Sequence, residues 1–132
     1  MEEFERQIFD AQQFIGRVTT MINSSEIIIN SVLHQHQVSQ TGSTLNRFKR
    51  FLKLAEKIGT EVDLVQLDKD LGSLNHVANI TKHGNPVIGT NPQIFVYKGV
   101  GYTFDAKEIE KIDNLFTDIQ KRLMQVGAKK KI

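Results

Sequence analysis

Two histidines lie near the end of a leucine-rich segment, at a spacing that places them on the same side of a helix. From Leu64 to His83 the leucines recur at helical intervals, which predicts one buried face. His76, Asn79, Ile80 and His83 would project to the opposite side of that helix. Imidazoles exchange protons near neutral pH, and an asparagine amide can both donate and accept hydrogen bonds. We therefore expect a candidate site at the last two turns of this helix.

The common catalytic motifs are absent from the sequence. There is no Gly-Lys-Ser/Thr phosphate loop, no Gly-x-Ser-x-Gly, no His-Glu-x-x-His and no calcium-binding loop. Four histidines could in principle converge on a metal, because His34 and His36 are two residues apart and His76 and His83 are two helical turns apart. No carboxylate lies at ligand spacing, so we expect neither a metal site nor a cofactor, and we interpret His34 and His36 as parts of a polar loop.

Four segments have the periodicity of amphipathic helices. Apolar residues recur at intervals of three and four along residues 4–32, 45–58, 64–83 and 109–126. The first segment carries a second apolar line, which favours a bundle over an isolated coiled coil. Between the last two segments, Ile94–Tyr97 and Val100–Phe104 flank Lys98-Gly99, which predicts a β-hairpin. The expected fold is mainly α, an up-and-down four-helix bundle with a small β-hairpin before the last helix.

Composition limits the classes to which the protein can belong. The 132 residues suit one domain, for which we expect a helical unit over residues 1–127 and a basic, disordered tail over residues 128–132. The net charge of +2 does not by itself indicate nucleic-acid binding. The absence of cysteine, of a secretion signal and of a long apolar run predicts a soluble, cytoplasmic protein without membrane contact.

The segment Asn79-Ile80-Thr81-Lys82-His83-Gly84 resembles the latter part of the Arg-Asn-x-x-x-His motif of the HEPN (higher eukaryotes and prokaryotes nucleotide-binding) superfamily. The layout of helices is also similar. The resemblance implies an all-helical domain that forms a homodimer, with a metal-independent ribonuclease site in the cleft between protomers. His83 matches the catalytic histidine and Asn79 the polar residue after the arginine, but Ala78 occupies the arginine position.

Without that arginine, a cation that would stabilise the charge developing on the phosphate is missing. The expected function is therefore a HEPN-like module of weakened or no activity, which dimerises through the Asn79/His83 face and binds RNA or a protein partner, in a bacterial or phage defence setting such as a toxin–antitoxin pair. The alternative is a metal-independent endoribonuclease with His83 as general base and Asn79 in support. The candidate RNA- or partner-binding residues are His76, Lys82, Arg47, Arg50 and Lys98.

A purely structural interpretation stands beside both functions. Asn79 and His83 could cap the end of the helix or bond to the following loop, since short polar side chains often do so. The hairpin aromatic residues, including Tyr97 and Tyr102, could stack on bases near Lys98, but such residues more often pack against helices.

Overall fold

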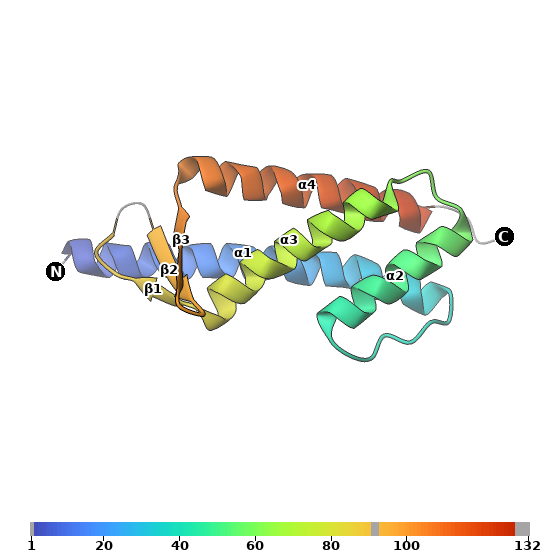
Figure 1. Ribbon diagram of the computed structural model, residues 1–132, viewed down its shortest axis with the longest axis horizontal. Helices are drawn as coiled ribbons and strands as arrows, with labels where there is room; N and C mark the ends of the chain where they lie inside the picture. The colour runs from blue at the N-terminus through green and yellow to red at the C-terminus, as the bar shows by residue number, and fades with distance from the viewer. Residues whose placement is uncertain (1, 91–92, 129–132) are drawn as a thin grey trace.

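The computed structural model describes residues 2–90 and 93–128, which form four helices and a small antiparallel sheet (Figure 1). The expectation of a mainly helical chain is confirmed. The helices and strands are α1 (Glu2–Gln35), α2 (Thr44–Ile58), α3 (Leu64–His83), β1 (Asn85–Val87), β2 (Gln93–Tyr97), β3 (Val100–Phe104) and α4 (Ala106–Ala128). Ala128 belongs to α4, and the rest of the predicted tail, residues 129–132, lies outside the described residues.

The helix ends follow local side-chain chemistry. The Ser43 hydroxyl accepts a hydrogen bond from the backbone N–H of Asn46 at 3.2 Å, and the Asp105 carboxylate accepts one from Glu108 at 2.8 Å. Both bonds satisfy amides that a helix cannot pair internally. Gly59, with φ of 81°, ends α2 in the left-handed conformation that favours glycine. These starts and stops agree with the sequence patterns.

The direction of the helices differs from simple up-and-down alternation. In Figure 1, α1, α2 and α4 run the same way along the molecule and α3 runs back. The loop of residues 36–43 doubles back along α1, so that the Thr44 hydroxyl, at the first position of α2, donates to Glu26 of α1 at 2.7 Å. Phe14 in the first half of α1 contacts Phe104 just before α4, and Val32 near the end of α1 lies beside Gly127 near the end of α4, as expected for two parallel neighbours.

The sheet has one strand more than the predicted hairpin. Its order is β1-β2-β3, and the third strand, β1, contains Pro86 opposite Phe95. Proline lacks an N–H and is tolerated at a sheet edge, which is the position of β1. The sequence pattern predicted only the two strands of the hairpin, and β1 is a strand that it did not predict.

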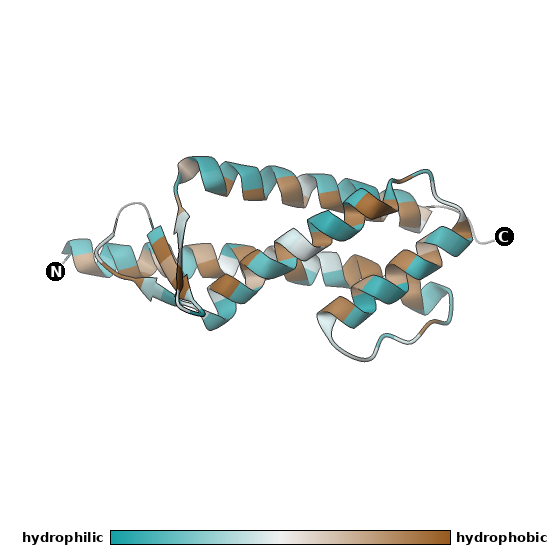
Figure 2. Cartoon of the chain, viewed as in Figure 1, coloured by the Kyte–Doolittle hydropathy of each residue, from teal (hydrophilic) through white to brown (hydrophobic). Residues whose placement is uncertain are grey.

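The core consists of the apolar helix faces together with one face of the sheet. Figure 2 shows hydrophobic and hydrophilic residues alternating along each helix. The Phe14 ring of α1 lies 5.9 Å from that of Phe95 and 4.8 Å from that of Phe104, measured between centroids, and these contacts fix the sheet against α1. Ile80 is only 2% exposed, so it does not share the outward side of α3 as predicted. The reason is that β2 packs against α3 near this end.

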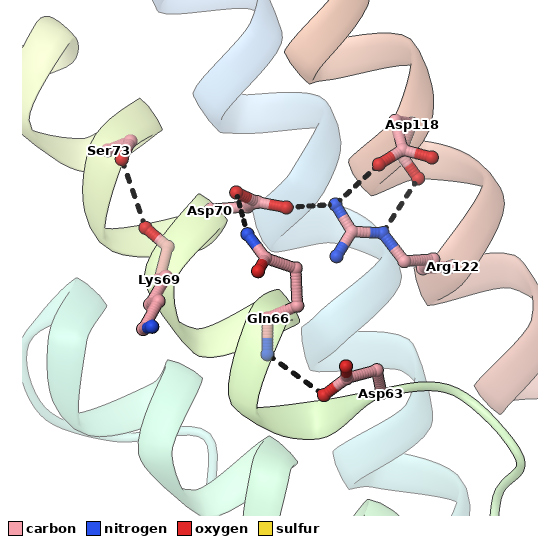
Figure 3. Close-up of polar contacts among 7 residues, drawn as sticks. All are labelled: Asp63, Gln66, Lys69, Asp70, Ser73, Asp118 and Arg122. Atoms are coloured by element: carbon pink, nitrogen blue, oxygen red, sulfur yellow. Dashed lines mark hydrogen bonds and ion pairs between the residues drawn. The ribbon is translucent and has the colours of Figure 1, made fainter.

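A polar network joins α3 to α4 in the half of α3 distant from the sheet (Figure 3). Arg122 of α4 contacts Asp70 of α3 at 2.5 Å and Asp118 of its own helix at 2.8 Å. Gln66 donates its side-chain N–H to Asp70 at 3.0 Å. The Arg122 and Asp70 side chains are 13% and 17% exposed, so their charges are largely removed from water but paired. This network fixes the register between the two helices.

Candidate functional site

The last two turns of α3 carry the predicted site residues on an outward side. His83 is the final residue of the helix and is exposed, as is His76, while Asn79 between them is half-buried. Within residues 2–90 and 93–128, neither the Asn79 nor the His83 side chain makes a hydrogen bond or an ion pair. Asn79 therefore does not cap the helix, and both side chains are free to contact a ligand.

Gly84 sets the position of this helix end against the sheet. Its N–H donates to the carbonyl of Ile80 at 2.9 Å. A Cβ at this position would lie 2.3 Å from that same carbonyl oxygen and 3.0 Å from the carbonyl oxygen of Val96 in β2. The chain can pass between α3 and β2 only because glycine has no side chain. His83, the residue before Gly84, is thereby held next to the β2–β3 hairpin.

The hairpin adds aromatic and cationic groups to the same end of α3. The His76 ring meets the Tyr102 ring edge-on, with centroids 5.5 Å apart. The Lys98 ammonium lies 5.3 Å from the centroid of the Tyr97 ring. Lys98 and Gly99 have φ angles of 51° and 75°, the left-handed pair typical of a two-residue hairpin turn. The turn therefore presents Lys98 in a fixed position.

We call this region the α3–hairpin surface. It includes three of the five predicted RNA- or partner-binding residues, His76, Lys82 and Lys98, and all of its members are contributed by the end of α3 or by the turn and strands beside it. Ala78, at the motif arginine position, is half-buried and packs against the core. The α3–hairpin surface consists of His76, Asn79, Lys82, His83, Tyr97, Lys98 and Tyr102.

The structure does not bring Arg47 and Arg50 to this surface. Arg47 pairs with Glu26 of α1 at 3.1 Å, and Arg50 donates to the backbone carbonyls of Ser39, at 2.6 Å, and Thr41. Both arginines therefore hold the connection between α1 and α2, and in Figure 1 α2 lies away from the sheet. A helix-two arginine does not replace the missing motif cation next to His83.

The chemistry available at the α3–hairpin surface is recognition of an anion and proton transfer by an imidazole. Two lysines and two histidines supply positive or titratable groups, and two tyrosines supply flat rings. In the part of the chain that the structure describes, no group of three or more His, Cys, Asp or Glu side chains could hold a metal ion.

The contact between His76 and Tyr102 has no signal in local sequence. It depends on how the hairpin folds onto α3, and the two residues are far apart in the chain. The Lys98-Gly99 turn does fix the pairing of Phe95 with Tyr102, and this pairing determines that Tyr102 faces the helices. The side of the sheet on which Tyr102 lies was therefore predictable once the turn was recognised.

Comparisons with known proteins give no relative: no family model matches the sequence, and no curated protein or solved structure matches it. Across residues 2–90 and 93–128, none of the helices is both long and apolar enough to span a bilayer.

Proposed function

We propose that this protein is a HEPN-like helical module, weakened or inactive as a nuclease, that dimerises and binds RNA at the α3–hairpin surface. The observation that carries the proposal is the exposed, unpaired His83 on the last turn of α3, with Asn79 one turn before it. Four helices with a β insertion between the third and the last support the HEPN-like assignment, although the parallel direction of α1 and α2 departs from up-and-down order.

RNA fits the chemistry of this surface better than a neutral ligand does. Lys82 and Lys98 are exposed and can neutralise phosphates. Tyr97 and Tyr102 are half-buried and pack against the core, so the charge of the lysines, and not stacking on these rings, supports RNA as the ligand. Ala78 cannot supply the cation that the motif arginine would give, so binding without efficient cleavage is the expected outcome.

The double variant Lys82→Glu/Lys98→Glu is expected to bind single-stranded RNA at least about tenfold more weakly than the wild type. Loss of two phosphate contacts should also reduce the slope of log K against log salt by about 1.4. Fluorescence anisotropy with a labelled oligonucleotide at several salt concentrations measures both quantities.

The matched control is Lys49→Glu/Lys53→Glu, which reverses two exposed charges on α2. This control should bind RNA nearly as the wild type does. Equal losses in both double variants would indicate a general charge effect, and no binding by the wild type at low salt would contradict RNA as the ligand and favour a protein partner.

The second candidate function, a metal-independent endoribonuclease, is favoured by the exposure of His83. For the weakened module, we expect at most slow cleavage of RNA in EDTA, and any cleavage should be lost in His83→Ala but kept in His34→Ala, which alters an exposed histidine at the far end of α1. A gel assay over several hours measures this. Rapid cleavage that depends on His83 would establish the enzyme instead, whereas cleavage that survives His83→Ala would exclude His83 as the base.

A further inference from the structure

The outer face of α1 carries large apolar side chains that no other part of the described chain covers. Phe9 is 56% exposed and Ile27 is 66% exposed. Both lie on the side of α1 opposite its buried residues, and the four residues between them on that same side are uncharged and exposed. We define the outer α1 stripe as Phe9, Gln13, Gly16, Thr20, Asn23 and Ile27.

The stripe is symmetric about its centre. Phe9 and Ile27 are eighteen residues apart, which is five full helical turns and about 27 Å along the axis. Gln13 and Asn23 lie equally far from residue 18, and so do Gly16 and Thr20. A two-fold axis that crosses the stripe at the level of residue 18, on the side of α1 opposite the buried Val18, would therefore bring Phe9 of one copy against Ile27 of the other. Such self-complementarity is what a two-fold dimer interface requires.

The surface beside the stripe has room for a partner side chain. A groove of about 650 Å³ is lined by Phe9, Gly16 and Ile109 and also by the charged residues Asp10 and Arg17. It adjoins a hollow of about 480 Å³, and the two share Arg17 and Thr20. No heavy atom lies within 4 Å of a Cβ placed on Gly16. In the two-fold arrangement, Ile27 of the second copy would enter the groove next to Phe9.

Charge distinguishes this face from the α3–hairpin surface. The six residues of the outer α1 stripe are uncharged. Of the charged residues beside it, Arg17 is paired with Asp113 and Glu26 with Arg47, while Asp10 lines the groove. Two copies that met through the α3–hairpin surface would bring Lys82 and Lys98 of both copies into one interface, and like charges at an interface are unfavourable. The uncharged stripe therefore suits a second copy, and the cationic surface suits an anion.

We infer that two copies of this chain associate through the outer α1 stripe, with their α1 helices antiparallel about residue 18. The arrangement differs from the shared Asn79/His83 cleft that the family resemblance implies, and it leaves both α3–hairpin surfaces open. The inference rests on the proposed dimerisation but not on RNA binding.

Gly16→Glu tests the interface directly. The new side chain has free space in the single chain, and replacing a helical glycine favours the helix, so the fold should be kept or stabilised. In the dimer, two carboxylates would lie near the two-fold axis in a water-poor contact, and we expect the dimer dissociation constant to rise by about 100-fold or more. Sedimentation velocity over a concentration series measures this constant.

Gly72→Glu is the matched control. Gly72 is an exposed glycine on the outward side of α3, one turn before His76, and it too has no heavy atom within 4 Å of an added Cβ. The two variants add the same charge, and both replace a helical glycine by a residue that favours the helix. Thermal unfolding verifies that both remain folded. Gly72→Glu should stay a dimer.

Other outcomes overturn the inference and separate it from the proposed function. Dissociation by Gly72→Glu but not Gly16→Glu would assign the dimer to the α3 face. Dissociation by both variants, or by neither, would also exclude a contact specific to α1. A wild type that is monomeric at about 100 µM, where a contact with a Kd below that value would be seen, would refute both dimerisation and the α1 interface but would leave RNA binding to be judged separately.

Disulfide formation tests the antiparallel register, because the chain has no cysteine of its own. A mixture of Gln13→Cys and Asn23→Cys chains should form an intermolecular disulfide on oxidation, since these positions face each other in the inferred dimer. Each variant alone should not, because its two cysteines would be about 15 Å apart. Crosslinking of either variant with itself, but not in the mixture, would overturn the register.

Discussion

Replacement of Phe95 by alanine is expected to lower the free energy of unfolding by about 3–5 kcal/mol, the range for deletion of a buried aromatic ring. Phe95 is fully buried, and its ring centroid lies 5.9 Å from that of Phe14 and 5.8 Å from that of Phe104. It therefore joins α1, β2 and β3. Loss of the ring removes apolar burial and leaves a cavity where three elements meet, and the sheet that presents Lys98 should loosen.

Urea unfolding followed by far-ultraviolet circular dichroism measures the effect of Phe95→Ala. Phe4→Ala is the control, because it deletes the same side chain at a position that is 51% exposed. We expect the control to change the free energy of unfolding by no more than about 0.5 kcal/mol. A loss below about 1 kcal/mol in Phe95→Ala would contradict the central role of this ring in the core.

Gly84→Ala is expected to lower the free energy of unfolding by about 2–3 kcal/mol, near the upper end for overpacking. The new Cβ would lie 2.3 Å from the Ile80 carbonyl oxygen, which is backbone and cannot move without disturbing α3. The penalty is steric, because φ of −81° and ψ of 170° are accessible to any residue. The end of α3 and the hairpin should separate, and RNA binding should weaken with stability.

The control for Gly84→Ala is Gly72→Ala, at a helical glycine with open space around it. This change should raise the free energy of unfolding by about 0.5–1 kcal/mol, because alanine favours the helix. Thermal and urea unfolding of the two alanine variants should thus move in opposite directions. Equal stability of Gly84→Ala and the wild type would show that α3 and β2 can separate without cost.

The sequence predicted the helices well because their signals are local. The apolar periodicity, the Ser43 and Asp105 caps and the Gly59 stop act within a few residues of where they occur, and the helix ends follow them. The strand β1 was missed because Pro86 opposes strand formation in isolation, and only pairing with β2 makes Asn85–Val87 an edge strand. The burial of Ile80 also depends on this sheet.

The direction of α2 was not predictable from periodicity. A helix has the same apolar pattern in either direction, and short loops favour antiparallel neighbours. Here the loop of residues 36–43 runs back along α1 and is held by Arg50, which contacts the carbonyls of Ser39 and Thr41. Only the tertiary structure shows that a basic residue on α2 binds this loop instead of lining a site.

The candidate site was predicted in part. Helical geometry correctly placed His76 and His83 outward, because the leucines define the buried side. Lys98 joins them through the fold of the hairpin onto α3. Arg47 does not join them, because Glu26 competes for its charge. The family resemblance indicated which residue types form the site but not which residues lie next to His83 in the folded chain. Those neighbours determine which cations can contact a ligand at the site.

The contact of Phe14 with the sheet has a consequence for biosynthesis. The partner rings of Phe14 belong to Phe95 and Phe104, so at least eighty-one residues must be translated after Phe14 before the first of them exists. At ribosomal speeds of roughly 5–20 residues per second, that interval is about 4 s or longer. During this time the amino-terminal half of α1 emerges with its apolar seam still uncovered, and a chaperone near the exit tunnel can reach it.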